Sequence, residues 1–172
     1  MAKKLNILGI VSAVLVLVGL ILSIVGMCVP VLFNGKLDIS IKLFDESWDA
    51  LKDVGGLASV LGQSASVPDR TFTIIAFVVL LVSGAASLAN SVLMMLGKNI
   101  KLLGILAGVA MLLGGVLVLA AGLWLAIDYS DFMHLTGENS LLPATGVWLG
   151  LVGGLLGGIS GIVTTKKAAK KK

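Results

Sequence analysis

Four long runs of apolar residues dominate the sequence and divide it into spans and loops. Apart from Lys101 at the edge of the third run, none of them contains Asp, Glu, Lys, Arg or His. Each run is longer than the roughly 20 residues that a helix needs to cross a hydrocarbon core of about 30 Å. We therefore predict an all-α membrane protein, a four-transmembrane-helix bundle, with spans at about residues 5–29, 72–96, 100–127 and 143–164.

The polar segments between the runs are short, with one exception. Loops at residues 30–71 and 128–142 lie on one side of the predicted bundle, and a lysine-rich tail at 165–172 lies on the other. Because only Gly97–Asn99 separate the second and third spans, these two helices must form a tight antiparallel pair. No flexible linker is long enough to separate domains, so we expect residues 1–172 to form a single domain.

The first loop opens with the pattern of a β-hairpin, which predicts a small sheet outside the membrane. Asn34-Gly35 is the preferred two-residue turn because both positions tolerate positive φ. Two strands alone are marginally stable in water, so the hairpin needs a third strand or a helix beneath it. After the turn, apolar and polar residues alternate strictly, and one face of the second strand is apolar: Leu37, Ile39, Ile41 and Leu43.

A short helix after the hairpin could provide that support. Asp45 or Ser47 can cap it, and Trp48 begins its apolar face. Trp48 either anchors this segment at the membrane interface or contacts a partner. The extracellular contact residues that we predict are Trp48, Leu37, Ile39 and Ile41.

Basic residues are sorted by position, and this predicts the orientation. All nine acidic residues lie in the two loops, which hold only four basic ones: Lys36, Lys42, Lys52 and Arg70. The segments on the other side contain no acidic residue and hold the rest: Lys3, Lys4, Lys98, Lys101, Lys166, Lys167, Lys170, Lys171 and Lys172. We expect both termini in the cytoplasm and both loops outside, at the cell membrane because no retention signal is visible. The tail either ends the last span or attracts anionic lipid head groups.

Composition indicates that lipid is the main solvent of the chain. Apolar residues make up 58% of it and charged residues 13%, which is more apolar surface than a soluble domain of this size can bury. The single cysteine, Cys28, excludes a disulfide within the chain. The expected partners are the lipid bilayer and a membrane protein, which is either another copy of this chain, giving a homo-oligomer, or a different protein.

Small residues form ridges along the last predicted span. Close contact between small residues holds membrane helices together, because the hydrophobic effect contributes little between them. These ridges either pack the four helices of one chain or dock a further copy or a partner subunit, as in a glycine zipper. Packing within one chain is the first interpretation, and two ridges on one helix, which exceed what a single neighbour needs, support the second. They are Gly146, Gly150, Gly154 and Gly158, and beside them Gly153, Gly157 and Gly161.

The sequence holds little chemistry for catalysis or transport. Asn90, the most polar side chain well inside a span, is typical of an interhelical hydrogen bond. Apart from Lys101 at the edge of the third span, the spans lack the ionisable groups that are typical of pumps. Asp131, His134 and Glu138 share a face if the third helix continues past the membrane, where they either ligate a divalent cation or form a solvated helix end. No hydrolase or nucleotide-binding motif occurs. We expect no enzyme activity, no cofactor, no nucleic acid and no small-molecule substrate.

The layout resembles the claudin-like tetraspan superfamily of membrane proteins. In that family a β-hairpin grows from the end of the first helix, and a tryptophan motif with a cysteine pair follows in the first loop. The cysteine pair is absent here, so the resemblance implies a distant relative. It implies a left-handed bundle with a small sheet that acts through contacts rather than catalysis. The residues that match are Pro30, Phe33, Asn34-Gly35, the strand Leu37–Leu43 and Trp48.

Four functions remain open at this stage. The first is a structural or adhesion protein that acts through lateral or extracellular protein–protein contacts. The second is an accessory subunit of a larger transporter or enzyme complex. A self-assembled channel is the third, with a pore lined by the serine row Ser83, Ser87 and Ser91. A membrane enzyme comes last, because no acid, base or nucleophile constellation occurs.

Overall fold

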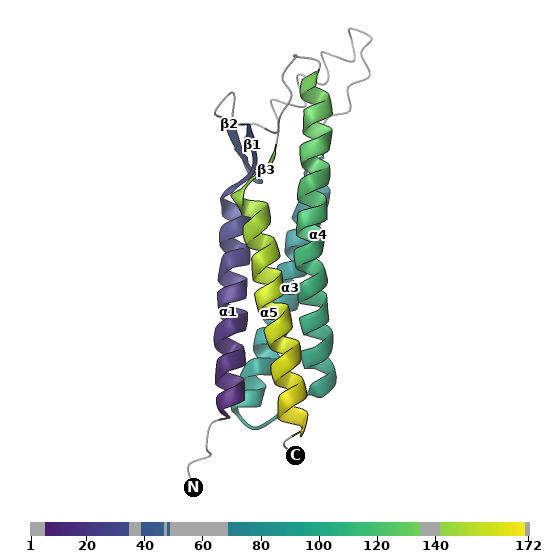
Figure 1. Ribbon diagram of the computed structural model, residues 1–172. Helices are drawn as coiled ribbons and strands as arrows, with labels where there is room; N and C mark the ends of the chain where they lie inside the picture. The colour runs from purple at the N-terminus through teal and green to yellow at the C-terminus, as the bar shows by residue number, and fades with distance from the viewer. Residues whose placement is uncertain (1–5, 35–38, 47, 49–68, 135–141, 171–172) are drawn as a thin grey trace.

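The computed structural model describes residues 6–34, 39–46, 48, 69–134 and 142–170. Four helices form an elongated bundle with a small sheet at one end, which we call the sheet end (Figure 1). α1 begins and α5 ends at the opposite end, the termini end, and neighbouring helices are antiparallel. The elements are α1 (Ile7–Cys28), β1 (Pro30–Asn34), β2 (Ile39–Lys42), α3 (Thr71–Met95), α4 (Lys101–His134), β3 (Leu142–Pro143) and α5 (Thr145–Lys170).

The four predicted spans are confirmed as four helices that are long and apolar enough to cross a membrane. Two of them end later than the apolar runs. α4 continues to His134 instead of ending near residue 127, and α5 continues to Lys170 through most of the predicted tail. In this last part of α5, Thr165 and Ala168 are buried. Packing against the bundle, rather than apolar composition, therefore continues the helix.

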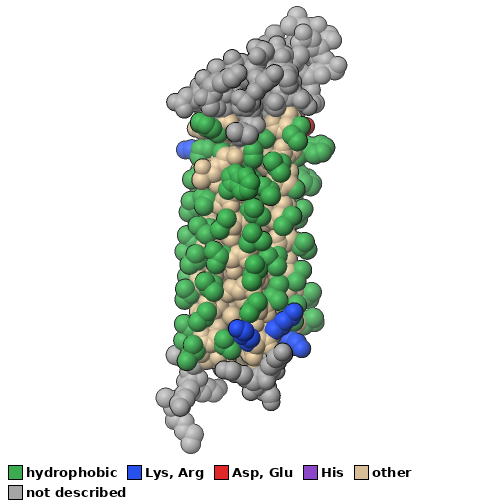
Figure 2. Space-filling model, in the orientation of Figure 1, with side chains coloured by type: hydrophobic (Ala, Val, Ile, Leu, Met, Phe, Trp, Pro, Cys, Tyr) green, Lys and Arg blue, Asp and Glu red, His purple; other side chains and the backbone are tan. Residues whose placement is uncertain are grey.

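The glycines of the helices are buried, whereas many large apolar side chains point outwards. Among these, Ile7 is 74% exposed and Leu102 is 70% exposed, and Figure 2 shows hydrophobic side chains over the whole length of one face. Lipid can solvate such a surface, and the four helices indicate an integral membrane protein. Along α1 the buried positions alternate in steps of three and four, a 3.5-residue repeat typical of left-handed packing: Gly9, Ser12, Val16, Gly19, Ser23 and Gly26.

The sheet has the strand order β2-β1-β3, with β1 in the centre. The third strand that the hairpin requires is β3, which comes from the second loop and pairs antiparallel with β1. Pro143, which we predicted at the start of the last span, therefore belongs to the sheet, opposite Leu32. A proline is tolerated there because β3 is an edge strand.

The turn of the hairpin differs from the predicted one. Asn34 pairs with Ile39, so residues 35–38 connect the strands and Asn34 itself is the last residue of β1. The prediction of a two-residue turn at Asn34-Gly35 is therefore wrong. The connecting residues lie outside the described part of the chain.

This longer connection keeps the described residues of the predicted apolar face, Ile41 and Leu43, on the buried side. Side chains alternate between the two faces of a strand, so a register change by an even number of residues keeps every side chain on its face. Ile41 and Leu43 are buried. Phe33 and Ser40, which pair with each other, lie on the exposed side.

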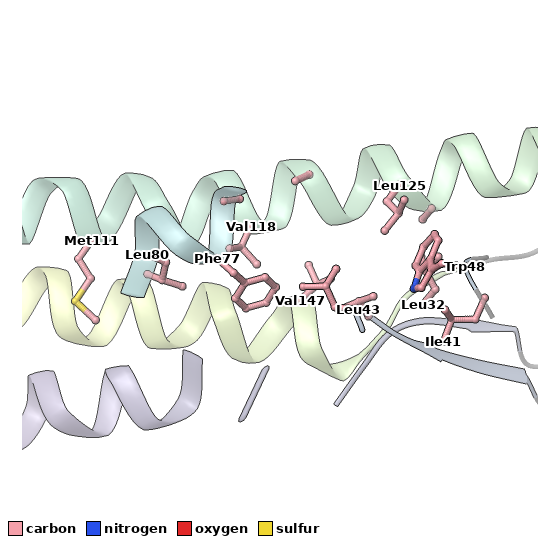
Figure 3. Packing of buried hydrophobic residues seen from close by; sticks show 14 of the residues in the cluster. Leu32, Ile41, Leu43, Trp48, Phe77, Leu80, Met111, Val118, Leu125 and Val147 are labelled. Carbon is pink, nitrogen blue, oxygen red and sulfur yellow. The ribbon is translucent and has the colours of Figure 1, made fainter. Parts of the chain in front are cut away.

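One hydrophobic core joins the sheet to the bundle (Figure 3). Phe77 of α3 and Val147 of α5 lie in its middle, and the row of side chains continues from there to the sheet end. Leu32 and Trp48 belong to the same cluster and are almost completely buried. The sheet is therefore packed on the helices.

Exposed tryptophan and lysine side chains lie at opposite ends of the bundle. Trp148 and Trp124 are exposed near the sheet end, and basic side chains gather at the termini end (Figure 2). From Trp148 to Lys167, α5 rises roughly 28 Å at about 1.5 Å per residue. This length is close to a hydrocarbon core of about 30 Å, and both residue types are common at its boundaries.

Candidate functional site

The first glycine ridge of α5 lies against α1 and α4 of the same chain. A Cβ atom added to Gly154 would lie 2.6 Å from the Cα atom of Gly115 in α4. One added to Gly158 would lie 2.7 Å from the carbonyl oxygen of Gly108. These helices therefore touch backbone to backbone. Every member of the ridge is buried: Gly146, Gly150, Gly154 and Gly158.

The second ridge of α5 is also occupied within the chain. Gly153 faces the carbonyl oxygen of Gly19 in α1, and Gly157 faces the side chain of Met111 in α4. A Cβ atom on Gly161 would lie 2.6 Å from the hydroxyl of Ser87 in α3. The ridge is buried along its whole length: Gly153, Gly157 and Gly161.

The two ridges are thus used for packing inside one chain. α5 lies beside α1 and α4 and also contacts α3 across the bundle, so it has three neighbours rather than one. Our expectation of spare contact surface assumed a single neighbour. The arrangement does not support a free assembly face on α5, and intramolecular packing accounts for all seven glycines.

Trp48 and Ile41, which we predicted as extracellular contacts, are only 2% and 3% exposed. Trp48 Nε1 donates a hydrogen bond of 2.8 Å to the carbonyl oxygen of Lys42. The guanidinium of Arg70 lies 5.5 Å from the centroid of the Trp48 ring, and its Nη1 donates to the carbonyl oxygen of Leu43 at 2.9 Å. Trp48 and Arg70, the residue before α3, therefore hold the hairpin together at the start of α3, and Trp48 is neither an exposed anchor nor a free contact.

The other two predicted contact residues cannot be placed in the same way. Leu37 lies outside the described residues, and Ile39 lies in β2 with its side chain outside the described part of the chain.

The described residues of the sheet end form a groove that we did not predict. Phe33 is 40% exposed and Trp148 is 49% exposed. The alternation along β1 was the available signal for Phe33, because it follows the buried Leu32. We call this surface the Phe33–Trp148 groove. It has a volume of about 580 Å³ between the sheet and the start of α5, and its lining is Pro30, Phe33, Ser40, Pro143, Ala144, Thr145 and Trp148.

A network of uncharged polar groups lies inside the termini half of the bundle. The hydroxyls of Ser12 in α1 and Ser91 in α3 are 2.8 Å apart. Thr164 Oγ1 of α5 lies 2.9 Å from the Ser12 hydroxyl. Asn90 Nδ2 donates to Thr165 Oγ1 at 3.3 Å, which confirms the predicted interhelical hydrogen bond. The network connects three helices.

The serine row of α3 faces the interior. Ser83, Ser87 and Ser91 are all buried. Ser83 Oγ donates to the carbonyl oxygen of Val79 at 2.8 Å, and Ser91 Oγ donates to that of Ser87 at 2.9 Å. In this packing Ser87 and Ser91 are only 1% exposed, so a pore lined by the whole row would require the bundle to open.

Two of the three proposed cation ligands lie on α4, which extends beyond the apolar run. α4 extends to His134, so Asp131 and His134 share this helix as we anticipated. Their side chains, and all of Glu138, lie outside the described part of the chain. Among the residues that the structure describes, no three His, Cys, Asp or Glu side chains are grouped to hold a metal ion.

Comparison with known proteins yields no relative for this chain. No family model matches it, and neither the curated proteins nor the solved structures contain a match. The claudin-like relationship therefore stays a prediction from the layout of the sequence. The chain itself shows four helices that are long and apolar enough to cross a membrane, with a small sheet at one end.

Proposed function

We propose that this chain is a non-catalytic membrane protein that binds another protein through the Phe33–Trp148 groove at its extracellular end. This is the contact role that a claudin-like protein would have. It does not depend on the glycine ridges, whose surface is covered by helices of the same chain.

The observation that supports this proposal is the contrast between the two faces of the sheet. Leu32 and Ile41 are buried against the bundle, whereas Phe33 remains 40% exposed on the other face. Trp148 stands across the groove from the sheet and is half-exposed. Aromatic side chains around a pocket are typical of the centre of protein interfaces.

A membrane anchor alone does not account for this pair. Trp148 lies in the first turn of α5, at a level where interfacial tryptophans are common. Phe33 belongs to a strand beyond the end of α1. Exposure of a large aromatic residue on the water side of the helices is better explained by a partner.

The proposed orientation follows from the charges. The sheet is joined to the loops that hold all nine acidic residues. The termini end holds Lys98, Lys101, Lys166 and Lys167, and basic residues favour the cytoplasmic side. The groove would then face the extracellular space.

Photo-crosslinking in native membranes tests the proposed function. A benzophenone amino acid at Phe33 should yield a protein adduct on illumination, and the same residue at the lipid-facing Leu102 should not. Trp148→Ala should reduce the adduct several-fold. Trp124→Ala is the matched control, because Trp124 is also exposed near the sheet end and does not line the groove.

The mass of the adduct also shows which protein occupies the groove. A mass of twice the chain indicates binding between copies, and any other protein mass indicates a different protein as the partner. Equal adduct from Phe33 and Leu102, or an adduct that Trp148→Ala leaves unchanged, would overturn the proposal.

A further inference from the structure

A second surface, independent of the proposed function, lies on the opposite half of the molecule. α1 and α5 enclose a groove with a volume of about 580 Å³, which we call the α1–α5 groove. Large apolar side chains from both helices form most of its lining, among them Leu15 and Val152. Ser160 also lines it, with a buried hydroxyl that has no hydrogen-bond partner, and Lys167 lies at the termini end.

The groove is long enough to hold one lipid chain. Along α5 it extends from Val152 to Lys167, which is roughly 22 Å at about 1.5 Å per residue. One leaflet accounts for about half of a 30 Å hydrocarbon core. The groove therefore covers the whole depth of the leaflet at the termini end and can hold an acyl chain along its length.

The charge at the end of the groove selects the head group. Lys167 is the charged residue among the described residues of the lining. A lysine near the end of a membrane helix extends its ammonium group to the interface, which is the level of lipid phosphates. The described lining contains no carboxylate that would repel an anion, and Lys3 and Lys4 precede α1 in the sequence.

The shape of the groove favours a lipid over a helix from another chain. Membrane helices dock through small residues that allow close backbone approach. The glycines of α1 are buried in the bundle, and those of α5 face the helices of this chain. Branched side chains such as Ile159 and Val163 remain on the rim, where they are 52% and 41% exposed. A flexible acyl chain can follow such an irregular surface.

We propose that the α1–α5 groove binds an anionic phospholipid, with one acyl chain between the two helices and the phosphate on Lys167. Lys167 is then a head-group ligand. One lysine near an anionic membrane surface contributes about 1 kcal/mol, so its loss should weaken binding about fivefold.

Native mass spectrometry of the full chain in detergent tests this site. Phosphatidylglycerol and phosphatidylcholine with identical acyl chains serve as probes. Wild type should bind phosphatidylglycerol more tightly, and Lys167→Gln should lose about fivefold in affinity for it while its affinity for phosphatidylcholine is unchanged. Lys166→Gln is the matched control: Lys166 is exposed on the same turn and is not part of the described lining.

A second pair of variants tests the apolar part of the groove. Val163→Trp should lower the binding of both lipids because it fills the space for the acyl chain. Val116→Trp adds the same bulk to an exposed position of α4 and should leave binding unchanged. Circular dichroism and elution volume report whether each variant is folded.

Three results would overturn the proposal. The first is equal affinity of wild type for the two lipids, and the second is the same loss for Lys166→Gln as for Lys167→Gln. The third is a wild-type dimer that Val163→Trp converts to a monomer without any effect of lipid, which would assign the groove to a second copy. None of these results depends on the Phe33–Trp148 groove.

Discussion

At the scale of single residues, the surroundings of each glycine decide how much a larger side chain there would destabilise the protein. Gly154 and Gly157 lie one turn apart on the same helix and are both buried. A Cβ atom on Gly154 meets backbone atoms of Gly115, which cannot move without shifting α4. On Gly157 it meets the end of the Met111 side chain, which is flexible and can adapt.

We therefore expect the same glycine-to-alanine substitution to have different effects on stability at these two positions. Gly154→Ala should lower the free energy of unfolding by about 1–3 kcal/mol, the usual cost of overpacking. Gly157→Ala should be nearly neutral, because the greater helix propensity of alanine offsets the small movement of Met111. Reversible unfolding in mixed micelles measures both. Equal destabilisation by the two substitutions would contradict the packing of α5 described here.

The buried tryptophan gives a second prediction at this scale. Trp48→Phe retains an aromatic ring but removes the donor to the Lys42 carbonyl oxygen, so it should cost about 1 kcal/mol of unfolding free energy. Trp48→Ala also leaves a cavity and should cost about 3–5 kcal/mol. Trp124→Phe is the control, since Trp124 is 65% exposed. A Trp48→Ala variant as stable as this control would show that Trp48 does not hold the sheet end.

At the scale of elements, the helices differ in how they are joined. Glycine contacts join α5 to α1 and α4, whereas hydroxyl groups also connect α1, α3 and α5. Ser12 lies at the centre of this network, between Ser91 and Thr164. Ser23 of α1 is different, because it donates to the carbonyl oxygen of Gly19 in its own helix.

This difference predicts the result of a double-mutant cycle. Ser12→Ala should lower the free energy of unfolding by about 0.6 kcal/mol, the average for interhelical hydrogen bonds in membranes. Ser91→Ala added to it should cost less than when made alone, because the two hydroxyls bond to each other. Ser23→Ala with Ser91→Ala should be additive. Additivity in both cycles would mean that the hydrogen bond between Ser12 and Ser91 contributes nothing to the free energy of unfolding.

At the scale of the whole molecule, the two ends differ in charge and structure. The sheet end holds the exposed tryptophans, and the termini end holds the lysines of the short link and of α5. The proposed orientation, with the sheet end outside, can be tested by thiol labelling in a Cys28→Ser background. Lys36→Cys should react with a membrane-impermeant maleimide in intact cells. Lys172→Cys should react only after permeabilisation, and the reverse pattern would invert the orientation.

The sequence by itself determined the four helices and the presence of a sheet. Long apolar runs can satisfy their backbone groups in lipid only by forming helices, so their length was sufficient to locate the spans. Strict alternation likewise predicted the apolar face of the second strand, and that face survived a wrong turn prediction because side-chain direction has a period of two. The 3.5-residue spacing of the residues that α1 buries, most of them glycine or serine, is also visible in the sequence, although we did not predict it.

Only the tertiary structure decided which surfaces are free. The glycines of α5 were compatible with an internal or an external contact, because a small residue allows close approach by any helix. Trp48 and Ile41 were equally compatible with exposure, and they are buried because the sheet end packs on the helices, where both residues join the hydrophobic core. The Phe33–Trp148 groove joins residues more than a hundred positions apart. Periodicity describes one element at a time, so it cannot report which elements meet.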